Sequence, residues 1–315
     1  MSSYVYIANT LGSDISVIDT ASQAVVQTIS VGNYPVGVAF LPNGTKAYVT
    51  NASSDNVSVI DTTSGSVTAT ISVGDNPTGI AITPDGTKAY VVNHNASTVS
   101  VINTSTDTVS STFSVGVSPY AIAITPNGSK AYVTNLSSTS ISVINLSNNS
   151  VSSISTTATH SLAAITPNGA EAYFTSMVFD KVTVINTSND TVTHNISSTL
   201  GPNGIAITPD GSTAYVVNVG GPSVLGTVSV ISTSSHTVTS TISLSTNSSA
   251  ISITEDGSTA FIADQSTTVS VLDLSSGSIT NTITVGNDSQ GLVKFILNNG
   301  PDLTPTALIT SWFGC

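Results

Sequence analysis

Short runs of alternating apolar and polar residues cover almost the whole chain and recur in the same order. An aromatic residue marks one run in each unit, and successive marks lie 42, 42, 42, 41, 42 and 46 residues apart, at Tyr6, Tyr48, Tyr90, Tyr132, Tyr173, Tyr215 and Phe261. Alternation of period two that is rich in Val, Ile and Thr predicts half-buried strands. A repeat of about 40 to 45 residues with several strands per unit is typical of a propeller or a solenoid.

Each unit holds four such runs and therefore predicts four strands. In the unit that starts at Tyr48 the runs read YVTN, VSVID, VTATISV and GIAIT. A turn such as Pro42-Asn43-Gly44 joins the fourth run to the next aromatic run. Pro presets one turn position and Gly takes the left-handed conformation at another, so these turns predict hairpins of antiparallel strands. Seven such units predict an all-β, seven-bladed β-propeller with four antiparallel strands in each blade.

The segment VSVIDTTSGSVTATISVGDNPTGIAITPDGTKAYVVN at 57–93 resembles the YVTN-type β-propeller repeat. The tetrapeptide that names this repeat stands at 48–51 and again at 132–135, and the resemblance covers residues 4 to about 300. The family is known from archaeal and bacterial cell-surface and surface-layer proteins. Its motif residues are strand and turn residues, so the resemblance implies the fold more strongly than it implies a function.

The two ends of the chain carry the parts of one incomplete unit. The resemblance implies that the GIAIT-type strand is innermost, yet the chain begins at an aromatic run, YVYIAN, with no such strand before it. It ends its repeats with GLVKFIL at 291–297. We therefore expect one C-terminal strand to join three N-terminal strands and close the ring over residues 1–300, which also removes exposed sheet edges. An open solenoid is the alternative, and it would leave both ends unpaired.

Composition limits the classes of binding partner and the cellular location that we expect for this protein. The chain has 315 residues, five Lys and Arg together against 17 Asp and Glu, and a formal net charge of −12. Without a basic stripe it is not expected to bind nucleic acid or an anionic membrane surface. No apolar run is long enough for a membrane span. The surface is expected to be rich in hydroxyls and amides, which favours an extracellular or cell-surface protein. No signal peptide is visible, so we expect a mature or trimmed form; a cytoplasmic protein is the alternative.

Covalent glycans are expected because Asn-x-Ser/Thr acceptors are abundant. The candidates are Asn51, Asn56, Asn95, Asn103, Asn135, Asn145, Asn148, Asn186, Asn189, Asn195, Asn247 and Asn287. A chain so rich in Asn, Ser and Thr also generates such motifs by chance. Asn43 and Asn127 lie inside tight turns and are expected to be poorer acceptors.

The sequence pattern predicts no catalytic or metal-binding site. The four histidines, His94, His160, His194 and His236, fall in different parts of the repeat, so a three-histidine metal site is not expected. The only glutamates, Glu171 and Glu255, do not form a paired acid and base. We expect no enzyme activity and no cofactor. The recurring Asp14, Asp19, Asp55, Asp61 and Asp273 predict turn caps, with calcium binding as the alternative.

Departures from the repeat indicate where partners bind. The unit at Tyr215 is four residues longer than the 42-residue norm, in a loop between Asn218 and Val228. Propellers most often use loops of this kind, on their top face, for binding. Another top-face loop reads SMVFDK. The candidates for a contact patch are Met177, Phe179, Val224 and Leu225. Packing of the SMVFDK residues beneath the neighbouring long loop is the alternative.

The tail at 301–315 matches no repeat, and it carries an apolar run that a solvent-exposed tail would not normally have. Its candidate assembly residues are Leu308, Ile309, Trp312, Phe313 and Cys315. The tail is expected to pack on its own propeller, on another subunit by strand addition, or on further chain. Cys315 is the only cysteine, so it would pair between chains or remain a free thiol.

Together these patterns favour a non-catalytic extracellular structural protein, a glycosylated propeller that serves as a building block of a cell-surface layer or filament. Its partners would be other copies of itself or other cell-surface proteins. The alternative is a cell-surface binding or adhesion module whose top-face loops capture a protein or a glycan.

Overall fold

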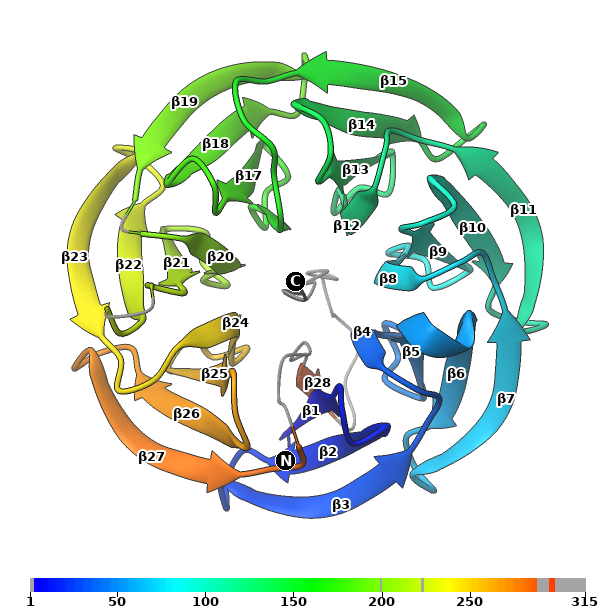
Figure 1. Cartoon of the computed structure of the whole chain (residues 1–315), viewed down its shortest axis with the longest axis horizontal. Helices are drawn as coiled ribbons and strands as arrows, with labels where there is room; N and C mark the ends of the chain where they lie inside the picture. Colours follow the sequence, from blue (N-terminus) through cyan, green and yellow to red (C-terminus); the bar gives the residue numbers. More distant parts are fainter. Residues whose placement is uncertain (1–2, 199, 222–223, 288–294, 298–315) are drawn as a thin grey trace.

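Each repeat folds into one blade, and the blades close into a seven-bladed β-propeller (Figure 1). The computed structural model describes residues 3–198, 200–221, 224–287 and 295–297. We number the blades along the chain, so that blade 1 holds β4 to β7, blade 2 holds β8 to β11, blade 3 holds β12 to β15, blade 4 holds β16 to β19, blade 5 holds β20 to β23 and blade 6 holds β24 to β27. Blade 7 holds β28, β1, β2 and β3. The predicted fold class is confirmed.

The two inner positions of each blade are short, apolar strands. The innermost strands are β4 (Pro35–Phe40), β8 (Pro77–Ile82), β12 (Pro119–Ile124), β16 (Ala163–Ile165), β20 (Pro202–Ile207), β24 (Ser248–Ile253) and β28 (Phe295–Leu297). The second strands, which carry the aromatic mark, are β1 (Ser3–Asn9), β5 (Lys46–Asn51), β9 (Lys88–Asn93), β13 (Lys130–Asn135), β17 (Glu171–Ser176), β21 (Thr213–Asn218) and β25 (Thr259–Asp264).

The third and outermost strands occupy the two outer positions of each blade. The third strands are β2 (Asp14–Asp19), β6 (Asn56–Asp61), β10 (Thr98–Asn103), β14 (Ser140–Asn145), β18 (Lys181–Asn186), β22 (Thr227–Ser232) and β26 (Thr268–Asp273). The outermost strands are β3 (Ala24–Ser30), β7 (Ser66–Ser72), β11 (Thr108–Ser114), β15 (Ser150–Ser155), β19 (Thr191–Ser197), β23 (Thr237–Ser243) and β27 (Ser278–Thr284). A single 3-10 turn, η1 (Ala52–Ser54), lies between β5 and β6 in the described part of the chain.

The prediction of half-buried strands is correct only for the outermost position. Strand β5 is buried along Ala47 to Asn51, and β6 is buried along Val57 to Ile60. Each sheet packs face to face against its two neighbours around the ring, so both faces of its inner strands are covered. Polar residues such as Thr50 and Ser58 are therefore buried between the blades, although alternation predicts them at the surface.

Two departures from the 42-residue period have simple structural causes. Strand β15 has six residues and pairs with β14 without a register shift, whereas outer strands such as β7 have seven and contain a bulge. This missing residue explains the 41-residue interval after Tyr132. The 46-residue interval after Tyr215 comes from the long connection between β21 and β22.

The predicted ring closure is confirmed. Strand β28 pairs antiparallel with β1, and Tyr4 lies opposite Ile296. Blade 7 is thus built from one C-terminal strand and three N-terminal strands, as Figure 1 shows where the red and blue ends of the chain meet. The tail at 301–315, with Leu308, Ile309, Trp312, Phe313 and Cys315, lies outside the described residues.

A buried asparagine at the end of the second strand joins the strands of most blades. Asn51 Nδ2 donates to Ser58 Oγ over 2.9 Å and to Asn56 Oδ1 over 2.8 Å. Asn9, Asn93, Asn135 and Asn218 bond to the corresponding serines of their own blades, and Asp264 accepts from Ser270 in blade 6. These bonds satisfy the side-chain nitrogens and hydroxyls that face-to-face packing removes from water, whereas Oδ1 of Asn9, Asn51 and Asn135 has no hydrogen-bond partner among the described residues.

In blades 1, 2, 3 and 7 a glycine without room for a side chain covers this asparagine; these glycines are Gly32, Gly74, Gly116 and Gly286. A Cβ at Gly32 would lie 2.7 Å from Cγ of Asn51, and one at Gly286 would lie 2.6 Å from Cγ of Asn9. Gly32 and Gly286 both follow the outermost strand of the preceding blade. The junction that closes the ring therefore has the same construction as an ordinary junction.

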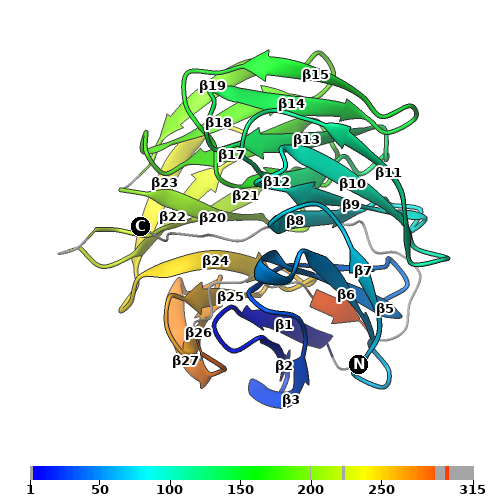
Figure 2. The same cartoon turned by 45° about the vertical axis from the view of Figure 1, so that its right-hand side comes forward.

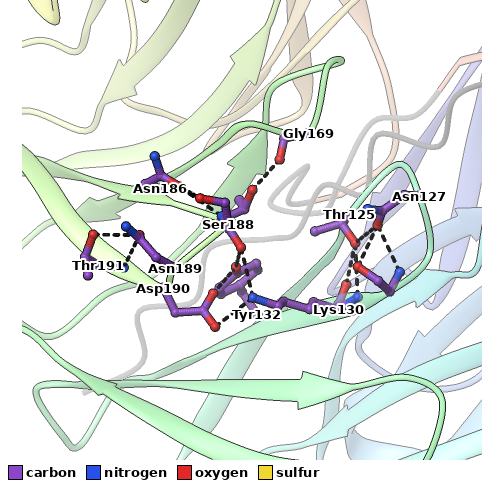
Figure 3. A network of polar contacts seen from close by, with 12 residues as sticks. Thr125, Asn127, Lys130, Tyr132, Gly169, Asn186, Ser188, Asn189, Asp190 and Thr191 are labelled. Atoms are coloured by element: carbon purple, nitrogen blue, oxygen red, sulfur yellow. Dashed lines mark hydrogen bonds and ion pairs between the residues drawn. The ribbon is translucent and has the colours of Figure 1, made fainter.

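A second contact ties neighbouring blades together near the turns between the third and outermost strands. In blade 3, Tyr132 Oη donates to Oδ1 of Asp190 over 2.6 Å and Lys130 Nζ donates to Oδ2 over 2.8 Å (Figure 3). Asp190 belongs to blade 4, in the turn between β18 and β19. Tyr48 and Asp107 repeat the contact between blades 1 and 2. Burial, with the neighbouring aspartate, raises the pKa of Tyr48 and of Tyr132.

The glycine above the buried asparagine provides a test of this packing. We expect Gly74→Ala to lower the free energy of unfolding by about 1–3 kcal/mol, because the added Cβ would lie 2.7 Å from Cγ of Asn93. Thr157→Ala is the control, since Thr157 is the exposed counterpart of Gly74 in blade 4 and a surface change there costs about 0.5 kcal/mol or less. Urea unfolding measures both. A Gly74→Ala protein as stable as the parent would contradict the expected close packing.

Candidate functional site

The two faces of the ring carry different kinds of connection. Because neighbouring strands are antiparallel, the turn from each innermost strand to the second strand lies on the same face as the turn from the third strand to the outermost strand. These are tight turns, and we call this the bottom face. The top face carries the loops from second to third strand and the connections from one blade to the next. Figure 2 shows the blades side by side around the ring.

Exposed large apolar side chains gather on the top face of blades 4 and 5. They are Val178 and Phe179 between β17 and β18, Leu200 between β19 and β20, and Val224 and Leu225 between β21 and β22. We call these five residues the apolar platform. Val178 is 74% exposed and Leu225 is 59% exposed. Elsewhere in the described chain, large apolar side chains are exposed singly: Leu11 at 64% and Val117 at 58% on other top-face connections, and Val26 at 55% on outermost strand β3.

Backbone hydrogen bonds join the three loops of the apolar platform. The Gly201 amide donates to Oδ1 of Asp180 over 2.8 Å, which ties the second loop to the first. The Val219 amide donates to the Gly201 carbonyl over 2.9 Å, and the Gly220 amide donates to the Leu200 carbonyl over 3.2 Å. The three loops that carry the platform residues are therefore hydrogen-bonded to one another across blades 4 and 5.

The structure divides the top-face candidates. Met177 is half-buried and packs beside Gly201, where a Cβ would lie 3.4 Å from Met177 Cγ. Phe179, Val224 and Leu225 are exposed. Sequence reasoning did not find Leu200, although an apolar residue stands there where other units have Asn33 or Asp75.

Cationic and acidic groups are sparse around the platform. Lys181 Nζ lies 5.6 Å from the centroid of the Phe179 ring and donates to Thr157 Oγ1 over 2.6 Å. Asp180 is held by the Gly201 amide. These two are the charged residues in the described parts of the three loops, so the platform carries no net charge.

His160 has a structural place in blade 4. It stands where other blades have a proline, such as Pro77, and Ser176 replaces the buried asparagine of the second strand. His160 Nε2 lies 3.0 Å from Oγ1 of Thr183, the residue that corresponds to the serine bonded by asparagine in other blades. The imidazole thus takes over the bond that the missing asparagine would make. Burial lowers the pKa of His160 to about 4.

The structure brings together two histidines that the sequence pattern separated. The rings of His194 and His236 stack with centroids 3.8 Å apart, and His236 Nε2 lies 2.9 Å from Oε1 of Glu171. His236 belongs to blade 5 and Glu171 to blade 4, so the contact resembles the blade-to-blade contact of Asp190 in its position. Within the described residues no three His, Cys, Asp or Glu side chains are grouped so that they could hold a metal ion.

The predicted aspartate caps are present. Asp61 Oδ1 accepts from the amides of Thr63 and Ser64, and the Ser64 bond lowers the pKa of Asp61. Asp19 and Asp273 cap the equivalent turns. Asp55 instead accepts from the Asn76 amide of the next blade, and Asp14 accepts from Asn9.

Two glycosylation candidates lie in the packed interior of the blades. Asn51 and Asn135 are fully buried, and their Nδ2 atoms donate to Ser58 and Ser142 inside the blades. Both are the last residue of a second strand and are buried there, so an attached sugar would have no space. Of the other candidates, Asn95, Asn145, Asn148, Asn189, Asn195 and Asn287 are exposed, and Asn56, Asn103, Asn186 and Asn247 are half-buried. No helix in the described residues is long and apolar enough to cross a membrane.

The low pKa of His160 predicts a specific acid sensitivity. The folded state holds this pKa below the ordinary value of about 6.5, so folding disfavours the protonated form. The corresponding stability is fully present above pH 6.5 and is lost as the pH falls towards 4. We expect His160→Gln to reduce stability at pH 7 but to lose about 3 kcal/mol less than the parent between pH 7 and pH 4.

Chemical denaturation at the two pH values checks this expectation. A matched variant, Thr157→Gly with His160→Pro and Ser176→Asn, installs the glycine, proline and asparagine of other blades. We expect it to be more stable than His160→Pro alone and to lack the acid loss. If the free energy of unfolding falls equally between pH 7 and pH 4 in the parent, in His160→Gln and in the triple variant, the role of His160 is contradicted.

Comparison with solved structures shows the same fold in proteins of other kinds. A protein of unknown function from Desulfotomaculum acetoxidans DSM 771 has 18% identity and a TM-score of 0.82, with 93% of this chain and 98% of that chain covered. Hydrazine synthase from Kuenenia stuttgartiensis has 20% identity and a TM-score of 0.75, with 83% and 95% covered. At these identities the likeness shows the fold alone. No curated protein sequence matches the chain.

One family model matches the chain over residues 8–170, from strand β1 to the turn before β17. The match covers more than half of the sequence and runs through blades 1 to 3. Its description is the choice-of-anchor I domain. The chain belongs to the choice-of-anchor I domain family.

Proposed function

We propose that this protein is a non-catalytic structural propeller of the cell surface, a rigid and glycosylated building block of an extracellular layer or filament. The apolar platform is the observation that carries the proposal. Five large apolar side chains exposed on adjacent loops are costly to leave in water, and such patches mark contact sites. Elsewhere the outward strands expose mainly Ser, Thr and single valines.

Three further observations support a place at the cell surface. The family description names an anchor. The repeats resemble the YVTN type of surface-layer and cell-surface proteins. The chain is rich in hydroxyl and amide side chains, with a formal net charge of −12 and a single cysteine.

A second copy of the chain is the partner that we propose for the apolar platform. Two copies with a net charge of −12 each repel one another over most of their surfaces. The described platform loops carry only Asp180 and Lys181, so contact through them avoids that repulsion. A contact between two platforms would be isologous and would pair the propellers by a two-fold axis. The tail at 301–315 remains the candidate for a second assembly contact.

A binding module is the second candidate function, in which the same platform captures a different protein. It is favoured by the exposed Phe179, because aromatic side chains are frequent anchors at protein interfaces. The two candidates differ in one measurable property, which is whether the isolated chain associates with itself.

Sedimentation of the recombinant, unglycosylated chain distinguishes them. We expect the parent to self-associate with increasing concentration, and Phe179→Ser with Leu225→Ser to weaken association at least tenfold, since each removes an exposed apolar anchor. Val109→Ser, on outermost strand β11, is the control and should associate as the parent does. A parent that stays monomeric would exclude the building-block role and favour the binding module. Unchanged association of the double variant would exclude the platform as the contact.

A further inference from the structure

Half of the Asn-x-Ser/Thr motifs share one structural setting on the bottom face of the ring. Seven of them lie in the tight turns of the bottom face: Asn43, Asn103, Asn127, Asn145, Asn148, Asn186 and Asn189. Each has its side-chain Oδ1 engaged by the residue two positions later in the chain. This group includes Asn43 and Asn127, which we ranked as poorer acceptors from the sequence.

The turn between β18 and β19 shows the geometry clearly (Figure 3). Asn186 Oδ1 accepts from the Ser188 amide over 2.9 Å and from Ser188 Oγ over 2.6 Å. Asn189 Oδ1 accepts from Thr191 Oγ1 over 2.7 Å. In both residues the oxygen makes the bonds, and Nδ2 has no hydrogen bond to any other described residue. Asn127, in the nearby β12–β13 turn, is exposed and bonds Ser129 in the same way.

Three motifs of the top face have the opposite arrangement. Asn51 and Asn135 donate from Nδ2 to buried serines, and Gly32 and Gly116 lie against their side chains. Asn56 Nδ2 donates to the Ser54 carbonyl over 3.0 Å. In these residues the nitrogen that a sugar would modify already holds the fold together.

We propose that N-linked saccharides attach to the bottom-face turn asparagines and that Asn51 and Asn135 remain bare. Nδ2 attacks the anomeric carbon of a saccharide carried on a lipid-linked phosphate. The Nδ2–C1 bond forms as the bond from C1 to the phosphate oxygen breaks, the lipid phosphate leaves with the electron pair, and Nδ2 loses one proton. No oxidant or reductant is involved.

The folded turns accept this modification without losing a bond. Replacement of one Nδ2 hydrogen by a sugar leaves Oδ1 of Asn186 free to keep both bonds from Ser188. At Asn51 the same replacement would break the bond to Ser58 and put a bulky polar group between packed strands. The fold therefore selects among identical sequence motifs by which atom of the asparagine it uses.

The consequence is a disc with two unlike faces, sugar-coated at the bottom and apolar at the platform. This rests on the extracellular location in the proposed function, because lipid-linked saccharide donors act on exported chains. Sugar on the bottom face would also shield that face from the platform of another copy, which favours contact between two platforms.

Glycopeptide mapping of protein from its native source tests the proposal. We expect saccharide on the bottom-face asparagines and none on Asn51 or Asn135, with each glycan assigned to its residue by fragmentation. A bare chain mass, or saccharide on Asn51 or Asn135, would overturn the proposal. Self-association is measured on recombinant unglycosylated protein, so failure of one inference is distinguishable from failure of the other.

Variants of one turn isolate the acceptor from the fold. Ser188→Ala breaks the motif of Asn186 and should remove one glycan mass, whereas Ser188→Thr keeps the motif and should retain it. Asn186→Gln should lose the same mass as Ser188→Ala. Retention of the glycan at this turn in Ser188→Ala would contradict the assignment of Asn186.

Discussion

Face-to-face packing of seven sheets is the constraint on which the rest of this structure depends. It covers both faces of every inner strand, so that residues which alternate as if half-exposed are buried on either side. Hydrophobic burial drives this packing, yet it also removes Ser, Thr and Asn side chains from water. The fold meets part of that cost with a polar contact inside each blade, as in the bond from Asn51 to Ser58, and in blades 1, 2, 3 and 7 a glycine leaves room for it.

Blade 4 shows that the packed interior requires a hydrogen bond and a side chain that fills the space. Different residue types can supply both. Ser176 is too short to make the usual bond, and His160 reaches the same hydroxyl position from the connection that leads into innermost strand β16. Thr157 stands at the position of the glycine in blades 1, 2, 3 and 7, and the second strand of blade 4 ends in Ser176 instead of asparagine. Three differences that look unrelated along the sequence are thus one local rearrangement.

The division of the ring into two faces organises the proposed functions. Antiparallel pairing places the turns from first to second strand and from third to fourth strand on the bottom. It places the loops from second to third strand and the connections between blades on the top, so each blade contributes to both faces. Function then depends on what individual loops carry. Blades 4 and 5 carry the apolar platform, and the bottom turns carry asparagines whose nitrogens are free of described contacts.

The sequence by itself determined the blade count, the four strands per blade and the closure by the two chain ends, because periodic alternation and hairpin turns are local signals. It also indicated the loops of Phe179 and Leu225, where the repeat is interrupted. It did not reveal that Leu200 completes the platform, that His194 stacks on His236, or that Asn51 and Asn135 are buried. Those facts depend on contacts between blades, and residues distant in the chain become neighbours only when the ring closes. An asparagine in an identical motif is a buried bond donor or an open amide according to its place in the blade, and only the tertiary structure decides which.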